Sequence, residues 1–114
     1  MDERLGMVET YLNTKLPDKW VDMSLYERRA WLQDPDDPTR MKGTVQRTEV
    51  SNPEIWAECF GRNPSDMRPA DSYAIAALMV QIDGWERTKI TNTVPIYGRQ
   101  RIYRRKSFVP GFLE

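Results

Sequence analysis

Residues 84–106 read GWERTKITNTVPIYGRQRIYRRK, and this stretch decides the fold because the hydrophobic pattern changes here from a helical period to a period of two. The runs WERT and RQRIYRRK are typical of β-strands, and about ten residues that include Asn92, Pro95 and Gly98 separate them. We therefore expect a β-hairpin with a long connection near the end of the chain.

The chain before this stretch begins with two helix signals and one strand signal. An amphipathic pattern predicts a helix over about residues 2–14. A second helix is expected over 25–33, where Ser24 and Glu27 have the spacing of a capping box. The alternating, β-branched run 44–50 then predicts a short strand.

Two further helices are expected between this strand and the hairpin. Asn52 can cap the first of them, Pro53 suits its first position, and an apolar stripe that includes Trp56 and Cys59 marks its buried side. The second is expected over 69–82, before Gly84. Its apolar residues recur at helical spacing and are Ile75, Leu78, Met79 and Ile82.

This order of elements predicts a small α+β domain that is winged-helix-like, with about four helices, a short strand and a C-terminal β-hairpin as the wing. We expect residues 1–15 to form an N-terminal amphipathic helix that serves as a linker to an upstream domain missing from the chain. The winged-helix-like domain is expected over 16–109, followed by a tail at 110–114.

The composition argues against catalysis. The chain of 114 residues has no histidine and a single cysteine, Cys59, which excludes a disulfide framework within the chain, a cysteine-cluster zinc site and histidine-dependent triads. It contains neither GxxxxGK[ST] nor GxGxxG. The prolines around Asp34, Asp36 and Asp37 predict a solvated turn rather than a calcium loop. We expect no enzyme activity, no cofactor and no metal.

Targeting signals are also missing from the sequence. No apolar run approaches the ~20 residues that a membrane-spanning helix needs. The polar, acidic start MDERLGMVET lacks the basic flank and apolar centre of a secretory signal. We therefore expect a cytoplasmic protein without a membrane partner.

The formal net charge of zero conceals an uneven distribution along the chain. Residues 1–83 carry 15 acidic against 10 basic side chains, whereas residues 84–114 carry 7 basic against 2 acidic ones. Such an asymmetry favours an anionic partner for the C-terminal quarter.

The expected hairpin concentrates these basic side chains. If Ile102 points into the core, alternation places Arg99, Arg101, Tyr103 and Arg105 on the outer face, where arginines pair with phosphates and a tyrosine stacks on a base. In a winged helix, the start of the last helix would also lie near the DNA. The predicted nucleic-acid-binding residues are Arg68, Ser72, Arg87, Lys89, Arg99, Arg101, Tyr103, Arg104, Arg105 and Lys106.

The basic residues of the hairpin also fit two roles that involve no nucleic acid. Lysine and arginine commonly protect an edge strand from aggregation, which needs no partner. The hairpin arginines could instead dock on an acidic protein surface. The residue pattern by itself is compatible with all three roles.

Four segments give the chain a family resemblance: LPDKWVDMSLYERRAWLQDP, GTVQRTEVSNPEIWAECFG, DMRPADSYAIAALMVQIDGWER and PIYGRQRIYRR. They resemble the C-terminal segment of the virulence-associated protein E family of phages and integrated mobile elements, over about Leu16 to Arg105. The most particular motifs are SLYERRAWL, EIWAE and the GWER turn followed by Tyr97, Gly98, Gln100 and Arg101.

The resemblance implies that the chain is one piece of a primase–helicase replication protein with a P-loop ATPase domain upstream. Because the ATPase motifs are absent here, that activity does not carry over, and no catalytic residue of the family maps onto this segment. We expect a non-catalytic accessory domain that binds DNA through its basic hairpin. The alternative is a protein-interaction or oligomerisation module that docks on the upstream ATPase domain without binding DNA.

Overall fold

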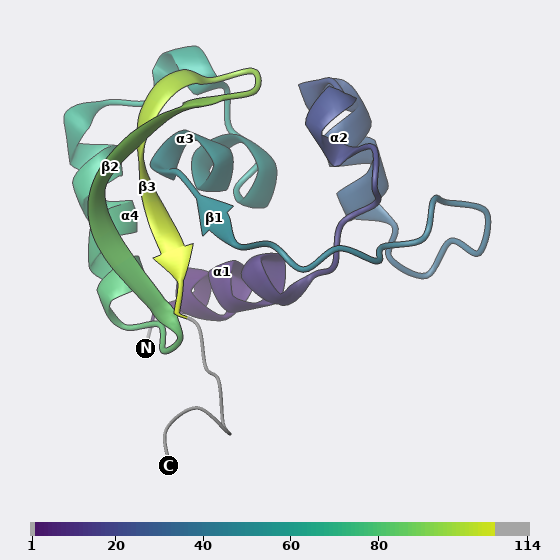
Figure 1. Cartoon of the computed structure of the whole chain (residues 1–114), viewed down its shortest axis with the longest axis horizontal. Coiled ribbons are helices and arrows are strands. Elements are labelled where there is room, and N and C mark those ends of the chain that lie inside the picture. The colour runs from purple at the N-terminus through teal and green to yellow at the C-terminus, as the bar shows by residue number, and fades with distance from the viewer. Residues whose placement is uncertain (1, 107–114) are drawn as a thin grey trace.

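Helices and strands follow one another in the expected order in the computed structural model, which describes residues 2–106 (Figure 1). The helices are α1 (Glu3–Asn13), α2 (Leu25–Gln33), α3 (Asn52–Glu54) and α4 (Pro69–Val80), and the strands are β1 (Glu49–Val50), β2 (Trp85–Val94) and β3 (Gly98–Arg105). Four helices with a three-stranded antiparallel sheet confirm the predicted α+β, winged-helix-like domain for this part of the chain. The end of the predicted domain at 107–109 and the tail at 110–114 lie outside the described residues.

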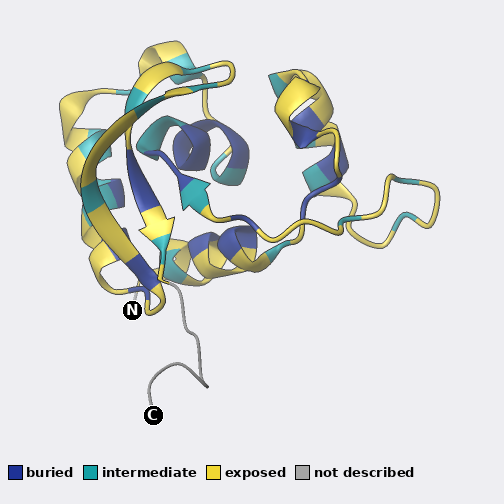
Figure 2. Cartoon of the chain, in the orientation of Figure 1, coloured by how far each residue is buried: buried dark blue, intermediate teal, exposed yellow. Residues whose placement is uncertain are grey.

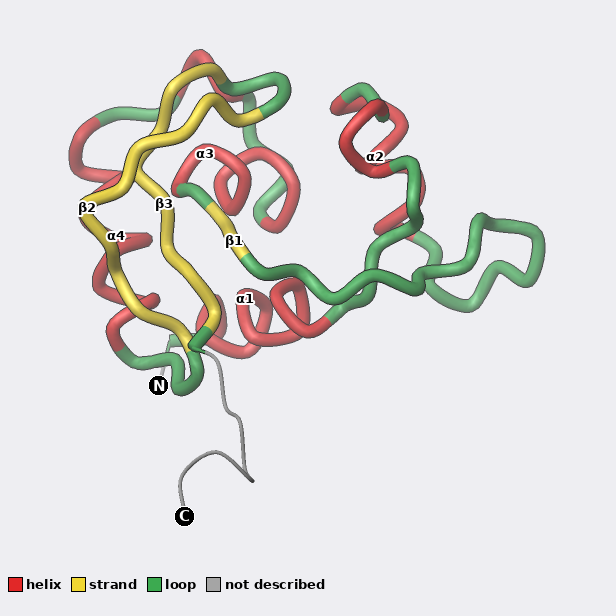
Figure 3. Tube along the Cα trace, viewed as in Figure 1, coloured by secondary structure: helices red, strands yellow, loops and turns green. Residues whose placement is uncertain are grey.

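The three strands are arranged in the order β1-β3-β2, so β3 is the central strand (Figure 3). Tyr103 of β3 lies opposite Val50 of β1 on one side and Arg87 of β2 on the other. The two long strands form a curved hairpin that closes over α3 and α4 (Figure 1). A register shift between Arg87 and Thr91 interrupts their pairing, as in a β-bulge.

The hairpin connection is shorter than predicted. Strand pairing continues to Val94 and resumes at Gly98, so only Pro95, Ile96 and Tyr97 connect the strands instead of about ten residues. β-Branched threonines extend β2 through the region that includes Asn92, where a loop is expected from the sequence. Ile96 and Gly98 adopt positive φ angles of 77° and 76°, and glycine accommodates this conformation without the steric cost of a side chain.

The first strand is also shorter than predicted. Only Glu49 and Val50 pair with β3, rather than the whole of 44–50. The earlier part of that run pairs elsewhere, because Val45 exchanges backbone hydrogen bonds with Leu16 at 2.8 and 2.9 Å. The segment 44–48 therefore ties the chain after α1 to the sheet.

The helix that begins at Asn52 continues as a π-helical turn, Ile55–Cys59. The Phe60 N–H donates to the Ile55 carbonyl at 3.0 Å, five residues back, and the turn buries Ile55, Trp56, Ala57 and Glu58. Its cap is Ser51 rather than the predicted Asn52. The Glu54 carboxylate accepts hydrogen bonds from both the N–H and the hydroxyl of Ser51, at 2.7 and 2.8 Å.

The strongest local helix signals are confirmed. Ser24 and Glu27 form the predicted capping box, with hydrogen bonds of 2.8 and 3.2 Å. Helix α4 ends at Val80, shortly before the predicted end at Ile82. The buried residues of this region are the predicted ones, Ile75, Leu78, Met79 and Ile82.

The core consists of a main cluster and a smaller one (Figure 2). The main cluster includes Val8 and Leu12 of α1, so the N-terminal helix packs with the π-helical turn, α4 and the sheet. Its predicted additional role as a linker to an upstream domain stays a prediction. The smaller cluster joins Trp31 of α2 to the chain between α1 and α2 and contains Leu16, Trp20, Met23 and Trp31.

Candidate nucleic-acid interface

A basic groove of about 520 Å³ lies between the hairpin and the beginnings of α3 and α4. Half of the ten predicted nucleic-acid-binding residues line it: Arg68, Ser72, Arg87, Arg101 and Tyr103. We call it the arginine groove, after Arg68, Arg87 and Arg101. Three arginines and no acidic residue line the groove, as judged from the described part of the chain.

As judged from residues 2–106, the three groove arginines are available to a ligand. Arg68, Arg87 and Arg101 are exposed, and none of them takes part in the ion pairs formed within residues 2–106. Each guanidinium can therefore present its planar donor fork to a phosphate, the geometry that favours arginine at nucleic-acid surfaces.

The beginning of α4 supplies the side chains of Arg68 and Ser72 to the groove. The Asp71 carboxylate accepts a hydrogen bond from the Arg68 N–H at 2.9 Å, so the helix caps its own N-terminus. Ser72 lies in the first turn, as predicted, and its hydroxyl accepts a hydrogen bond from Asn52 Nδ2 at 2.8 Å. This contact fixes the groove wall formed by α3 against α4.

Tyr103 is buried, contrary to the prediction that it lies on the outer face of the hairpin and stacks on a base. Its side chain is only 5 % exposed and belongs to the main core cluster. Alternation correctly placed Ile102 and Tyr103 on opposite faces, but both are buried because β3 is covered on both sides. Burial also raises the pKa of the Tyr103 hydroxyl. Tyr103 therefore forms part of the groove floor.

Arg105 and Arg104 also differ from the prediction. Arg105 is half-buried, and its Nε and Nη2 donate to the carbonyls of Arg47 and Leu12, each at 2.8 Å. Its guanidinium lies 4.7 Å from the Trp85 ring centroid. Arg104 points to the other face of the strand and pairs with Glu49 at 3.3 Å. Both arginines thus have structural partners instead of an open position at the groove.

The remaining predicted residues lie elsewhere on the hairpin and do not line the groove. Arg99 is exposed and pairs with Thr93 near the hairpin tip. Lys89 lies exposed within the irregular part of β2, and Lys106 lies exposed at the end of β3. Five of the ten predicted residues therefore line the groove. These three, together with Arg104 and Arg105, do not.

Edge protection remains a role for most basic residues of the hairpin, because large parts of both long strands are paired on one side only. β3 is the central strand, but β1 pairs only with its Tyr103 and Arg104, so the part of β3 that carries Arg99 and Arg101 is paired on one side only and edge protection applies to these arginines as well. β2 is an edge strand within the described sheet, and edge protection applies to its Arg87 and Lys89 and to its bulge. Edge protection does not account for Arg68, which the beginning of α4 brings to the same groove.

Sequence reasoning missed a buried network around Glu58. Its carboxylate accepts hydrogen bonds from Arg28 Nη1 at 2.9 Å and from the hydroxyls of Tyr11 and Tyr97, each at 2.7 Å. Burial raises the pKa of both tyrosines, and the Glu58 charge adds to the shift, so both hydroxyls stay protonated donors. The sequence signal that could have predicted this network is the position of Glu58 among the apolar residues of one expected helix.

The described residues show neither a membrane-spanning helix nor a cluster of metal ligands. Residues 2–106 contain no helix with the length and apolar character of a membrane span, and no group of three potential metal ligands.

The chain matches no model of a known protein family and no curated protein. The resemblance to the virulence-associated protein E family therefore stays a prediction.

Proposed function

We propose that this chain is a non-catalytic accessory domain of a phage-like replication protein in the cytoplasm, and that it binds DNA through the arginine groove. The observation that carries the proposal is the convergence of Arg68, Arg87 and Arg101 on a groove whose lining includes no acid among the described residues. Contacts between arginines and phosphates supply most of the sequence-independent affinity for DNA. Three such contacts suit an accessory role, in which the rest of the parent protein contributes further binding energy.

The proposal is tested by titrating labelled duplex and single-stranded DNA with the protein at several salt concentrations, with fluorescence anisotropy as the readout. We expect affinity to fall linearly with the logarithm of salt concentration. Replacing two groove arginines, Arg87→Gln with Arg101→Gln, should reduce the slope by about 2, because each phosphate contact contributes about 1.

Arg104→Gln provides the matched control for Arg101→Gln. Both substitutions remove one positive charge from β3, three residues apart, but Arg104 lies on the other face and pairs with Glu49. We expect Arg101→Gln to weaken binding and Arg104→Gln to leave it nearly unchanged. Equal losses in the two variants would show that net charge rather than the groove binds DNA, and no binding at low salt would refute the proposal.

The second candidate function is a protein-interaction module that docks on the upstream ATPase domain. Apolar side chains on the outer face of α4 favour it, because Tyr73 is 74 % exposed and Val80, nearly two turns later, is 80 % exposed. The same titration separates the two functions, since a module of this kind does not bind DNA even at low salt.

A further inference from the structure

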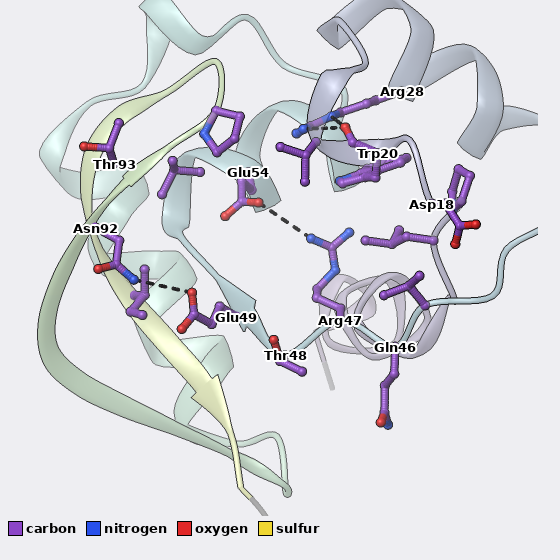
Figure 4. A pocket seen from close by; sticks show the side chains of 17 residues that line it. Asp18, Trp20, Arg28, Gln46, Arg47, Thr48, Glu49, Glu54, Asn92 and Thr93 are labelled. Carbon is purple, nitrogen blue, oxygen red and sulfur yellow. Dashed lines mark hydrogen bonds and ion pairs between the residues drawn. The ribbon is translucent and has the colours of Figure 1, made fainter.

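A second cleft, of about 510 Å³, is lined by Ile102 of β3 and so lies on the other side of this strand from the arginine groove, which Arg101 and Tyr103 line. Figure 4 shows this second cleft. It is formed by the hairpin, the segment 44–48 and the chain that follows α1, and it shares no lining residue with the arginine groove. Much of its wall is apolar, from Leu16, Trp20, Val45, Val94, Pro95 and Ile102. We call it the Arg47 cleft after its central side chain.

Arg47 is buried in this cleft and only partly paired. Its side chain is 3 % exposed, and Nη1 lies 3.7 Å from Glu54 Oε1, which is long for an ion pair. The guanidinium carbon lies 4.2 Å from the Tyr11 ring centroid. Figure 4 shows the guanidinium at the centre of the ring of lining residues, between Glu54 and Trp20.

Three hydrogen-bond donors in this place have no partner within the described residues: Arg47 Nε, Arg47 Nη2 and Trp20 Nε1. Buried donors of this kind are rare in folded proteins, and a missing ligand is one cause of them. The two arginine atoms lie on the same edge of the guanidinium, the edge that offers two parallel N–H groups. Such a fork fits the two oxygens of a carboxylate.

We propose that the Arg47 cleft binds a glutamate or aspartate side chain carried on an apolar segment of a partner protein. The carboxylate would accept hydrogen bonds from Arg47 Nε and Nη2 and from Trp20 Nε1, while the apolar wall contacts the neighbouring residues of the segment. Val21 and Val45 line the cleft and are 64 % and 47 % exposed, which leaves apolar surface for such a contact.

The charges around the cleft favour this occupant over nucleic acid. Asp18, Glu49 and Glu54 line the cleft and would repel the successive phosphates of a polyanion. Glu54 does not occupy the buried Nε and Nη2 edge of Arg47, because it faces Nη1 and is held by Ser51 at 2.7 and 2.8 Å. The site is thus distinct from the proposed DNA-binding groove in both position and ligand.

The indole N–H signals in a ¹H–¹⁵N NMR spectrum provide the test. The probe is the blocked tripeptide acetyl-Val-Glu-Val-amide, with acetyl-Val-Gln-Val-amide as its uncharged match and a thymidine dinucleotide as the phosphate arm. The Trp20 signal should shift and saturate with the glutamate peptide, at a concentration at least about tenfold lower than any effect of the glutamine peptide or the dinucleotide. Trp31 and Trp56 serve as internal controls, since their indoles already donate to the carbonyls of Met41 and Asn63, each at 2.7 Å.

Two variants locate the effect. Arg47→Lys keeps the charge but removes the fork, and it should weaken the peptide at least about tenfold, whereas Arg101→Gln should leave peptide binding unchanged. The comparison of the two peptides on the wild-type protein tests the proposal even if Arg47→Lys does not fold. An equal response to the two peptides, a stronger response to the dinucleotide, or a stationary Trp20 signal would overturn the proposal, whatever the outcome of the DNA titration.

Discussion

The buried arginines and the groove arginines have the same side chain but opposite surroundings. Arg28 is 2 % exposed and donates to the Trp20 carbonyl and to Glu58, so its charge is compensated inside the protein. Arg87 and Arg101 are exposed and take part in no ion pair within residues 2–106. The comparison shows that the number of arginines in a stretch says little about its function, whereas the partners of each arginine say much.

The two groups also differ in what their loss should affect. Arg28 of α2 joins elements that are distant in sequence, because it pairs with Glu58 of the π-helical turn. Its removal should therefore reduce stability. Within residues 2–106 a groove arginine forms no ion pair with another residue, so its removal should affect ligand binding alone. Three substitutions test this difference, and the expected loss of stability falls from the first to the third.

Glu58→Ala should have the largest effect. It leaves the Arg28 guanidinium buried without its carboxylate and removes the acceptor of both the Tyr11 and Tyr97 hydroxyls. Breaking a buried ion pair on one side costs about 3–5 kcal/mol of unfolding free energy. Urea unfolding monitored by circular dichroism measures the loss, with exposed Glu86→Ala as the control. A loss below about 1 kcal/mol would show that the network does not stabilise the fold.

Local signals made the helices predictable. The capping box of Ser24 and Glu27 and the periodic apolar residues of α4 lie within one or two turns of each other, so the sequence contains the whole interaction. The hairpin was predictable for the same reason, apart from its connection. Strand order was not, because the pairing of β1 with β3 joins Val50 to Tyr103 across half the chain.

The candidate site was predictable only in part. Alternation along β3 separated Ile102 from Tyr103 correctly, but it could not show that both faces of the strand are covered. The sequence likewise could not distinguish Arg101 from Arg105, since two residues of the same type on one strand face carry the same pattern. What distinguishes them is the distant backbone of Leu12 and Arg47, to which Arg105 donates.

Tyr97→Phe should have an intermediate effect. It deletes only the hydroxyl that donates from the hairpin tip to Glu58 at 2.7 Å, and a hydrogen bond to a charged group contributes about 1.5–3 kcal/mol. Amide hydrogen exchange should also become faster around the tip, because this bond holds it against the π-helical turn. Tyr26→Phe is the matched control, since Tyr26 is 73 % exposed. Equal unfolding midpoints for the two variants would contradict the prediction.

Arg101→Gln should have the smallest effect on stability and so tests the comparison most directly. Because Arg101 is exposed and forms no ion pair within residues 2–106, its loss should change the unfolding free energy by no more than about 0.5 kcal/mol. Arg105→Gln removes the same group four residues later but also deletes hydrogen bonds to two backbone carbonyls, which should cost about 1–3 kcal/mol. Urea unfolding should show the larger loss of stability for Arg105→Gln, since Arg105 supports the fold. DNA titration should show the larger loss of affinity for Arg101→Gln, since Arg101 supports binding. If the two variants lose stability equally, the division between buried and groove arginines is wrong.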